Sequence, residues 1–266
     1  MFRLRQAGDV WYYTIDAFEE TGLVRHCFST RRGGVSQGEY ESMNLRLNCG
    51  DAAENVRENF RRICGAVGID SQQLVLSSQI HGDAIYVAKK EDRGDGIVRP
   101  NPRESADGLM TGEPGVPLAT FYADCVPLFF LDPVKRVIAL SHSGWKGTVR
   151  RIGAKTVEKM TAVYGSRPQD ILAAVGPSIG VCHFEVGPEV ADIFRREFGP
   201  ETVREQGEKP HVNLQKAVAL QLLAAGIQPG KLTVADICTY CNHDLLFSHR
   251  QTGGRRGSLG AFMELI

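Results

Sequence analysis

Three short polar segments contain residue types suited to metal chemistry. Gln79-Ile80-His81-Gly82, Ala123-Asp124-Cys125-Val126-Pro127 and Ser141-His142-Ser143-Gly144-Trp145-Lys146-Gly147 each adjoin an apolar run typical of a strand. His81, Cys125 and His142 are therefore candidates to meet at one rim of a sheet. Two imidazoles and a thiolate leave one open position on Zn²⁺, which is the arrangement a catalytic zinc needs.

The same residues allow two other interpretations, because the spacings of 44 and 17 residues are too long for a local zinc-finger pattern. In one, Cys125 is a nucleophilic thiolate, a histidine is its base, and Asp124 or Asp107 orients a histidine or binds a hydroxyl. In the other, a buried cysteine and two hydrogen-bonded histidines belong to the core. The residues alone leave all three open.

A second group of thiols lies near the C-terminus, where Cys238-Thr239-Tyr240-Cys241 precedes His243. A C-x-x-C pair can bind one metal ion together with a histidine, or form a redox disulfide. A thioredoxin-like role is disfavoured because the motif does not follow a strand and open a periodic helix. We favour the interpretation of two ordinary thiols beside a substrate loop.

Arginines adjoin two glycine-rich turns, at Thr30-Arg31-Arg32-Gly33-Gly34 and within residues 250–257. A guanidinium beside flexible backbone suits phosphate or carboxylate binding, which makes Arg31 and Arg250 candidate anion ligands. Neither segment matches a Walker A or a dinucleotide motif. Solvated turn charges are the alternative interpretation.

The elements that must position these residues follow from hydrophobic periodicity. Strands outnumber helices and do not alternate with them strictly, which favours an α+β fold with helices covering a mixed sheet over a doubly wound fold. Pro127 predicts a bend or an edge. Helices are predicted at Glu54–Val67, Thr148–Val163, Gly187–Phe198 and after an Asn213 cap up to Gly226. Strands are predicted at Val10–Ile15, Leu74–Ser77, Ala84–Val87, Leu118–Phe121, Leu128–Leu131, Val137–Ser141, Ile171–Val175, Leu232–Val234 and Ala261–Leu265.

Composition limits the function classes. The chain has 266 residues, 31 basic and 31 acidic, and it has no linker or repeat, so we expect a single domain over 1–266. Zero formal charge argues against nucleic-acid or membrane binding as the organising principle. No apolar run reaches about 18 residues, and the start lacks a signal-peptide core. Seven cysteines without an export signal favour free thiols in the cytoplasm.

Seven motifs in one order resemble a known family. The chain is similar to the YfiH family, also called the multicopper polyphenol oxidase or laccase family, and within it to the YlmD-type bacterial members. The resemblance runs from about Phe28 to the C-terminus. The motifs are Phe28-Ser29-Thr30-Arg31 with Gly33-Gly34-Val35-Ser36, Gln79-Ile80-His81-Gly82, Ala106-Asp107-Gly108, Ala123-Asp124-Cys125-Val126-Pro127, His142-Ser143-Gly144-Trp145-Lys146-Gly147, Gly176-Pro177-Ser178-Ile179 and Asp236-Ile237-Cys238-Thr239.

This resemblance implies a layered α-β-β-α sandwich and a metal, Zn²⁺ or alternatively Cu²⁺, held by His81, Cys125 and His142. It implies purine nucleoside phosphorylase activity, in which phosphate cleaves adenosine, inosine and 5′-methylthioadenosine to the free base and the (methylthio)ribose 1-phosphate. Adenosine deamination is an implied second activity. Within that scheme Arg31 and Arg250 would neutralise phosphate, and Asp107 or Asp124 would hold ribose hydroxyls or help proton transfer.

The departures from the family pattern are mild, and the competing functions are distinct. Ser143 and Lys146 stand where the family usually has alanine and arginine, and Phe184 stands where tyrosine is common. A copper-dependent polyphenol oxidase is disfavoured because the chain has only seven histidines and no H-x-H pattern. A hydrolase editing cell-wall precursors, with Cys125 as nucleophile, is the main alternative. A non-catalytic ligand-binding protein would not explain the His/Cys set.

Overall fold

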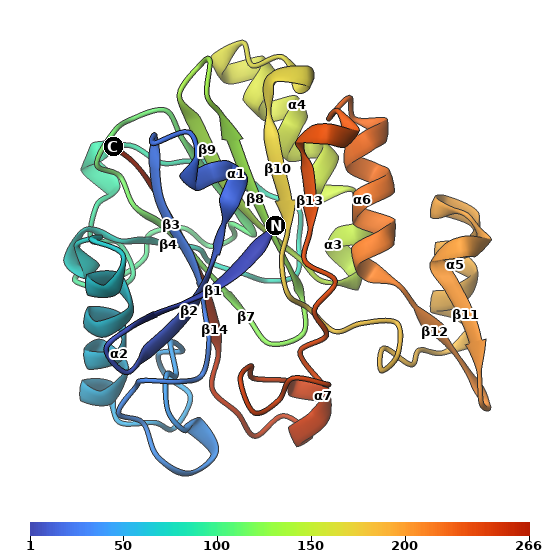
Figure 1. Cartoon of the computed structure of the whole chain (residues 1–266), viewed down its shortest axis with the longest axis horizontal. Helices are drawn as coiled ribbons and strands as arrows, with labels where there is room; N and C mark the ends of the chain where they lie inside the picture. Colours follow the sequence, from blue (N-terminus) through green and yellow to red (C-terminus); the bar gives the residue numbers. More distant parts are fainter.

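Two six-stranded mixed sheets form the centre of the computed structural model, which describes residues 1–266 (Figure 1). The first sheet has the order β1-β2-β3-β14-β7-β4, and only the β4–β7 pair is parallel. Its strands are β1 (Phe2–Ala7), β2 (Val10–Ile15), β3 (Val24–Ser29), β14 (Leu259–Leu265), β7 (Leu118–Tyr122) and β4 (Val75–Leu76). The last strand of the chain therefore lies in the middle of this sheet.

The second sheet has the order β13-β10-β8-β9-β6-β5, with parallel pairs at both edges and antiparallel pairs in the middle. Its strands are β13 (Leu232–Val234), β10 (Leu172–Val175), β8 (Val126–Asp132), β9 (Val137–Ser143), β6 (Gly108–Thr111) and β5 (Ile85–Val87). The strands β8 and β9 are buried along their whole length. Both faces of these strands are covered, which explains why their sequences are almost continuously apolar.

Helices cover the outer face of each sheet, which gives an α-β-β-α layering and confirms the expected fold class (Figure 1). One buried cluster joins the two sheets through residues such as Phe28, Leu259, Phe129 and Leu140. The helices are α1 (Asp16–Glu19), α2 (Ala53–Ala66), α3 (Trp145–Val149), α4 (Ile152–Tyr164), α5 (Pro188–Phe198), α6 (Leu214–Ala224) and α7 (His249–Thr252). α2 packs on the first sheet, whereas α4, α5 and α6 pack on the second. A small hairpin, β11 (Val203–Gln206) and β12 (Lys209–Val212), lies beside α5.

One prediction of local structure is wrong, and another is right only in part. The helix predicted at Thr148–Val163 is broken between α3 and α4, because Arg151 adopts a left-handed φ of 62°. Pro127 does not mark an edge, since it is the second residue of the central strand β8, but the chain does bend directly before this strand, at residues 123–125. Pro127 lies one residue beyond the β10 pairing, which ends at Leu128 opposite Val175, and its carbonyl accepts a hydrogen bond from Gly176 N.

The other predicted helices agree closely with the structure. Asn213 caps α6, because its side chain accepts a hydrogen bond from Lys216 N at 2.9 Å. The predicted strands are present with small shifts of their ends. No helix is both long enough and apolar enough to cross a membrane.

Candidate metal centre and its cavity

His81, Cys125 and His142 come together at one rim of the two sheets, and we call them the His₂Cys cluster. Their candidate ligand atoms all lie within 4.8 Å of one another. His81 is in the loop between β4 and β5, Cys125 is where the chain passes from β7 to β8, and His142 is near the end of β9. His81 and Cys125 thus lie in two loops that connect the first sheet to the second, and His142 lies in a strand of the second sheet.

Asp107, directly before β6, organises this cluster. Its Oδ1 lies 2.9 Å from Nδ1 of His142 and accepts a hydrogen bond from His81 N at 3.0 Å. Its Oδ2 accepts from Ile80 N at 3.1 Å and from Gly82 N at 2.8 Å. Because Nδ1 of His142 donates to a carboxylate, its Nε2 is free to face the cluster, as in carboxylate–histidine–zinc arrangements.

The electrostatics favour a thiolate. Burial raises the pKa of Cys125, but the charge of His142 and hydrogen bonds from both histidines lower it to about 6. Burial lowers the pKa of His142, but the Cys125 thiolate and Asp107 raise it to about 9. The pKa of Asp107 lies below its usual value, because the hydrogen bonds from His142 and the backbone outweigh burial. A deprotonated sulfur beside two imidazoles is the form of cysteine that binds metal.

The local backbone leaves room for the cluster. A Cβ on Gly144 would lie 2.9 Å from Nδ1 of His81 and 3.1 Å from Sγ of Cys125, so glycine is required there. One sulfur and two imidazole nitrogens within 4.8 Å of one another are a donor set that suits Zn²⁺ and leaves a fourth position for water or substrate. The residues present therefore fit the metal that the sequence resemblance implies.

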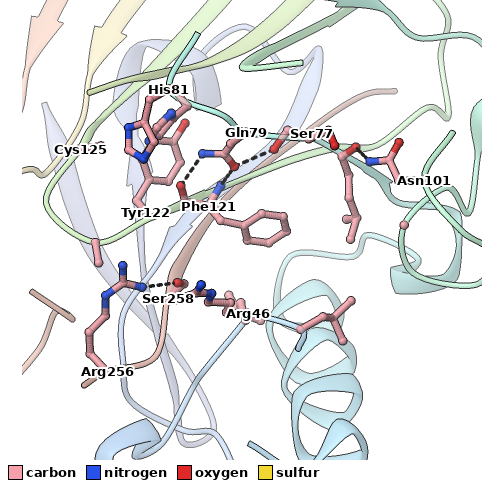
Figure 2. A pocket seen from close by; sticks show the side chains of 17 residues that line it. Arg46, Ser77, Gln79, His81, Asn101, Phe121, Tyr122, Cys125, Arg256 and Ser258 are labelled. Atoms are coloured by element: carbon pink, nitrogen blue, oxygen red, sulfur yellow. Dashed lines mark hydrogen bonds between the residues drawn. The ribbon is translucent and has the colours of Figure 1, made fainter. Parts of the chain in front are cut away.

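The cluster borders a cavity of about 490 Å³ (Figure 2). Figure 2 shows His81 and Cys125 on one side of this cavity, and Arg46 and Arg256 on the other. The walls between them include apolar side chains such as Leu45 and Phe121. A cavity of this size with apolar walls and charged ends is typical of a small-molecule site.

Arg256 and Arg46 are the functional candidates that sequence reasoning missed. Arg256 donates to the Ser258 hydroxyl at 2.7 Å, while its buried Nε has no hydrogen-bond partner. Burial and the neighbouring charge of Arg46 lower the pKa of Arg256. The two positively charged guanidinium groups repel each other, and an anion bound between them would offset this repulsion. The glycine-rich run of residues 250–257 contains both Arg250 and Arg256, and its pattern does not distinguish them.

A smaller cavity of about 250 Å³ shares His81, Cys125 and Arg256 with the first and is also lined by Asp124 and Arg250. Asp124 accepts hydrogen bonds from the Thr239 hydroxyl at 2.6 Å and from Arg250 N at 2.7 Å. The Arg250 guanidinium donates to the carbonyls of His183 and Glu185. Asp124 and Arg250 are thus close to the His₂Cys cluster, although the Arg250 side chain is held by backbone oxygens.

Two predicted substrate ligands occupy other surroundings. Arg31 donates to the carbonyls of Glu41 and His243 and lies against Phe247, outside both cavities. Asp107 is fully buried, and all its hydrogen bonds go to His142 and the backbone. Its position suits holding His142 rather than binding ribose hydroxyls.

Comparison with known proteins gives matches along nearly the whole chain. Residues 25–266 match the family model described as multi-copper polyphenol oxidoreductase laccase. The Bacillus subtilis (strain 168) protein named purine nucleoside phosphorylase YlmD is 35% identical over 240 residues, covering 89% of this chain and 86% of the relative. A Deinococcus radiodurans protein named purine nucleoside phosphorylase is 38% identical over 242 residues, covering 91% of this chain and 89% of the relative.

Solved structures agree with these matches. YlmD from Geobacillus stearothermophilus has a TM-score of 0.91 and 33% identity, covering 100% of this chain and 99% of that chain. The Bacillus licheniformis hypothetical protein YfiH has a TM-score of 0.92 and 32% identity, covering 99% of each chain. The layered fold is therefore shared over the whole length.

Proposed function

Because the chain belongs to the YfiH family, whose model is described as multi-copper polyphenol oxidoreductase laccase, we propose that it is a purine nucleoside phosphorylase. Relatives of this chain bear that name. The observation that carries the proposal is the cavity of about 490 Å³, which has the His₂Cys cluster on one side and two arginines on the other. Phosphorolysis joins a phosphate dianion to a neutral nucleoside, so its site needs a positively charged end for the phosphate and a separate region for the nucleoside.

We assign phosphate binding to Arg256 and Arg46. They line the cavity together. A phosphate bound between them would accept charge-assisted hydrogen bonds from both and relieve the repulsion between the two guanidinium groups. This assignment replaces Arg31, whose guanidinium is already held by two carbonyls outside the cavity. Arg250 borders the smaller cavity, where it supports Asp124 through its backbone.

The reaction needs no reagent beyond its two substrates. An oxygen of HPO₄²⁻ forms a bond to C1′ of the sugar as the C1′–N9 bond breaks, and the base keeps that electron pair. The proton of the phosphate passes to the departing base. We assign Asp124 to this proton transfer or to a sugar hydroxyl, because it borders Cys125 and is already oriented by Thr239.

We propose Zn²⁺ as the metal held by His81, Cys125 and His142, with Asp107 as the residue that orients His142. When bound, this metal supplies a Lewis acid and an activated water, which is the chemistry required for the proposed second activity, adenosine deamination. The proposed nucleosides are adenosine, inosine and 5′-methylthioadenosine. All three share a purine, whose flat apolar faces suit a cavity with apolar walls.

The donor atoms argue against laccase chemistry despite the family's name. A multicopper oxidase needs a blue-copper site and a trinuclear site, which together require many histidines. The chain has seven histidines, and the two groups that could hold a metal contain only three of them. All seven cysteines are free thiols, and we therefore propose a reducing, cytoplasmic location.

The test is incubation of metal-analysed protein with adenosine, with and without phosphate, followed by chromatography of the products. We expect adenine only when phosphate is present, and none from His81→Ala. Arg256→Ala removes charge-assisted hydrogen bonds worth about 1.5–3 kcal/mol, so the KM for phosphate should rise about 10- to 100-fold. Arg31→Ala is the matched control and should leave that KM unchanged.

Each other outcome identifies a different function. Inosine without phosphate dependence would leave a zinc deaminase and overturn the phosphorylase. A rise in phosphate KM in Arg31→Ala but not in Arg256→Ala would move the phosphate site back to the first glycine-rich turn. Turnover of cell-wall peptides that is lost on thiol alkylation, without metal, would favour the cysteine hydrolase.

A further inference from the structure

Four potential metal ligands outside the His₂Cys cluster lie close together, and we call them the Cys₃His cluster: Cys182, His183, Cys238 and Cys241. Their ligand atoms are all within 4.8 Å of one another. Cys182 and His183 lie in the loop between β10 and α5, and the other two lie between β13 and α7. The sequence motif C-x-x-C thus acquires two more ligands from a loop more than fifty residues earlier in the chain.

The distances within this cluster match a tetrahedral zinc site. Sulfur and nitrogen atoms bound to zinc at about 2.3 and 2.0 Å in a tetrahedron lie about 3.5–3.8 Å from one another. The Sγ atoms of Cys182 and Cys241 are 3.6 Å apart. Nδ1 of His183 is 3.3 Å from Sγ of Cys241 and 4.0 Å from Sγ of Cys238. These three distances are close to the spacing that zinc requires, and all four ligand atoms lie within 4.8 Å of one another.

The surroundings hold the ligands in place. The His183 ring stacks on Tyr240 with ring centres 3.9 Å apart, which fixes the direction of its Nδ1. The backbone N–H of Gly180 donates to Sγ of Cys238 at 3.2 Å, an interaction that stabilises a metal-bound thiolate. Cys241 is exposed, so an ion can reach the cluster from solvent.

We propose that the Cys₃His cluster binds one Zn²⁺ in a closed, structural site. Four protein ligands leave no open position for substrate, and thiolates with an imidazole select zinc over Mg²⁺ or Ca²⁺. A disulfide between Cys182 and Cys241 is the competing use of the same atoms. It would involve two thiols only, whereas all four ligands converge.

The proposed zinc joins two loops beside the catalytic cavity. Thr239, between the two cysteines of the C-x-x-C motif, donates to Asp124, the residue before Cys125. Arg250 donates to the carbonyl of His183. Loss of the ion would release the loop that orients Asp124, so the site supports the cavity from outside it.

The experiment titrates Zn²⁺ into reduced, metal-free protein in competition with a chromophoric chelator. The background is His81→Ala, which removes a ligand of the His₂Cys cluster and so isolates the second site. We expect the His81→Ala protein to bind one equivalent of Zn²⁺ tightly. The double variant with Cys241→Ser should bind none, whereas the control double variant with Cys49→Ser should still bind one. With Co²⁺ as probe, the sulfur-to-cobalt charge-transfer band should disappear with Cys241→Ser and persist with Cys49→Ser.

Substitution at His183 gives a test that does not depend on one cysteine. His183→Cys keeps four ligands and should still bind one equivalent of Zn²⁺ tightly, whereas His183→Ala should not. The proposal is overturned if the His81→Ala protein takes up no tight equivalent, if Cys241→Ser leaves uptake unchanged, or if the protein carries iron there. It is also overturned if Cys182 and Cys241 form a disulfide and the reduced protein binds no zinc.

Discussion

Asp107→Asn is the substitution that most directly tests how the candidate metal centre is built. The carboxylate accepts four hydrogen bonds, two at each oxygen, from His142 and the backbone of residues 80–82. An amide of the same shape offers one oxygen, so two of the four donors would face an NH₂ group. Each buried donor left without an acceptor costs about 1–3 kcal/mol.

The expected loss is therefore about 2–6 kcal/mol, a large share of the roughly 5–15 kcal/mol that stabilises a typical protein. Urea unfolding of the metal-free protein, followed by circular dichroism, measures it without any contribution from zinc. Zinc affinity should fall by about 10- to 100-fold as well, because His142 loses the partner that fixes its ring.

Asp132→Asn is the matched control. Asp132 is also fully buried, but its Oδ1 accepts both Val134 N and Lys135 N, and its Oδ2 has no partner. An amide can keep both hydrogen bonds there and presents its NH₂ to no donor. The role assigned to Asp107 is refuted if the two variants have free energies of unfolding within about 0.5 kcal/mol of each other and bind zinc equally well.

Three further outcomes are expected. Burial lowers the pKa of His26 to about 4, so the unfolded state binds more protons between pH 6.5 and 4. Acidification through that window should cost about 3 kcal/mol of stability, and the pH slope of urea unfolding should flatten in His26→Gln. Gly144→Ala would place a methyl group against the His₂Cys cluster and should lower kcat by about 100-fold, while Gly65→Ala, which faces open space, leaves steady-state kinetics unchanged. We also propose that residues 1–266 unfold in one calorimetric transition, because the last strand pairs inside the first sheet; two separated transitions would contradict this.

The fold could be predicted where the periodicity was strong. The face of α2 that holds Val56, Phe60 and Ile63 was visible as a helical repeat, and all three side chains are buried. The strands β1, β3, β6, β11 and β12 were not predicted. β1 is an edge strand whose exposed, charged side chains give no alternation, and β3 interrupts its apolar residues with Arg25 and His26. Whether such a segment forms a strand depends on the neighbouring strands with which it pairs, and the local sequence does not contain that information.

The candidate site was predictable by residue type and only partly by position. The convergence of His81, Cys125 and His142 was a correct expectation, because each follows or ends a strand. Asp107 was among the residues expected to orient a histidine, and its contact with His142 depends on the pairing of β6 with β9. Arg46 was not expected, because no local pattern places it beside the cavity. The same limit applies to the Cys₃His cluster, where two of the ligands come from a loop far from the C-x-x-C motif.

Backbone strain at the candidate site explains why these contacts are needed. His81 and Asp124 have φ values of 60° and 82°, although neither is glycine, and a left-handed residue of this kind costs about 1–2 kcal/mol. Asp107 binds the backbone on both sides of His81, while Thr239 and Arg250 hold the Asp124 carboxylate. Each strained residue is therefore held by hydrogen bonds from a distant segment. It follows that the two loops presenting His81 and Cys125 are positioned by buried carboxylates, and that loosening either carboxylate should displace one of these two side chains before it unfolds the sheets.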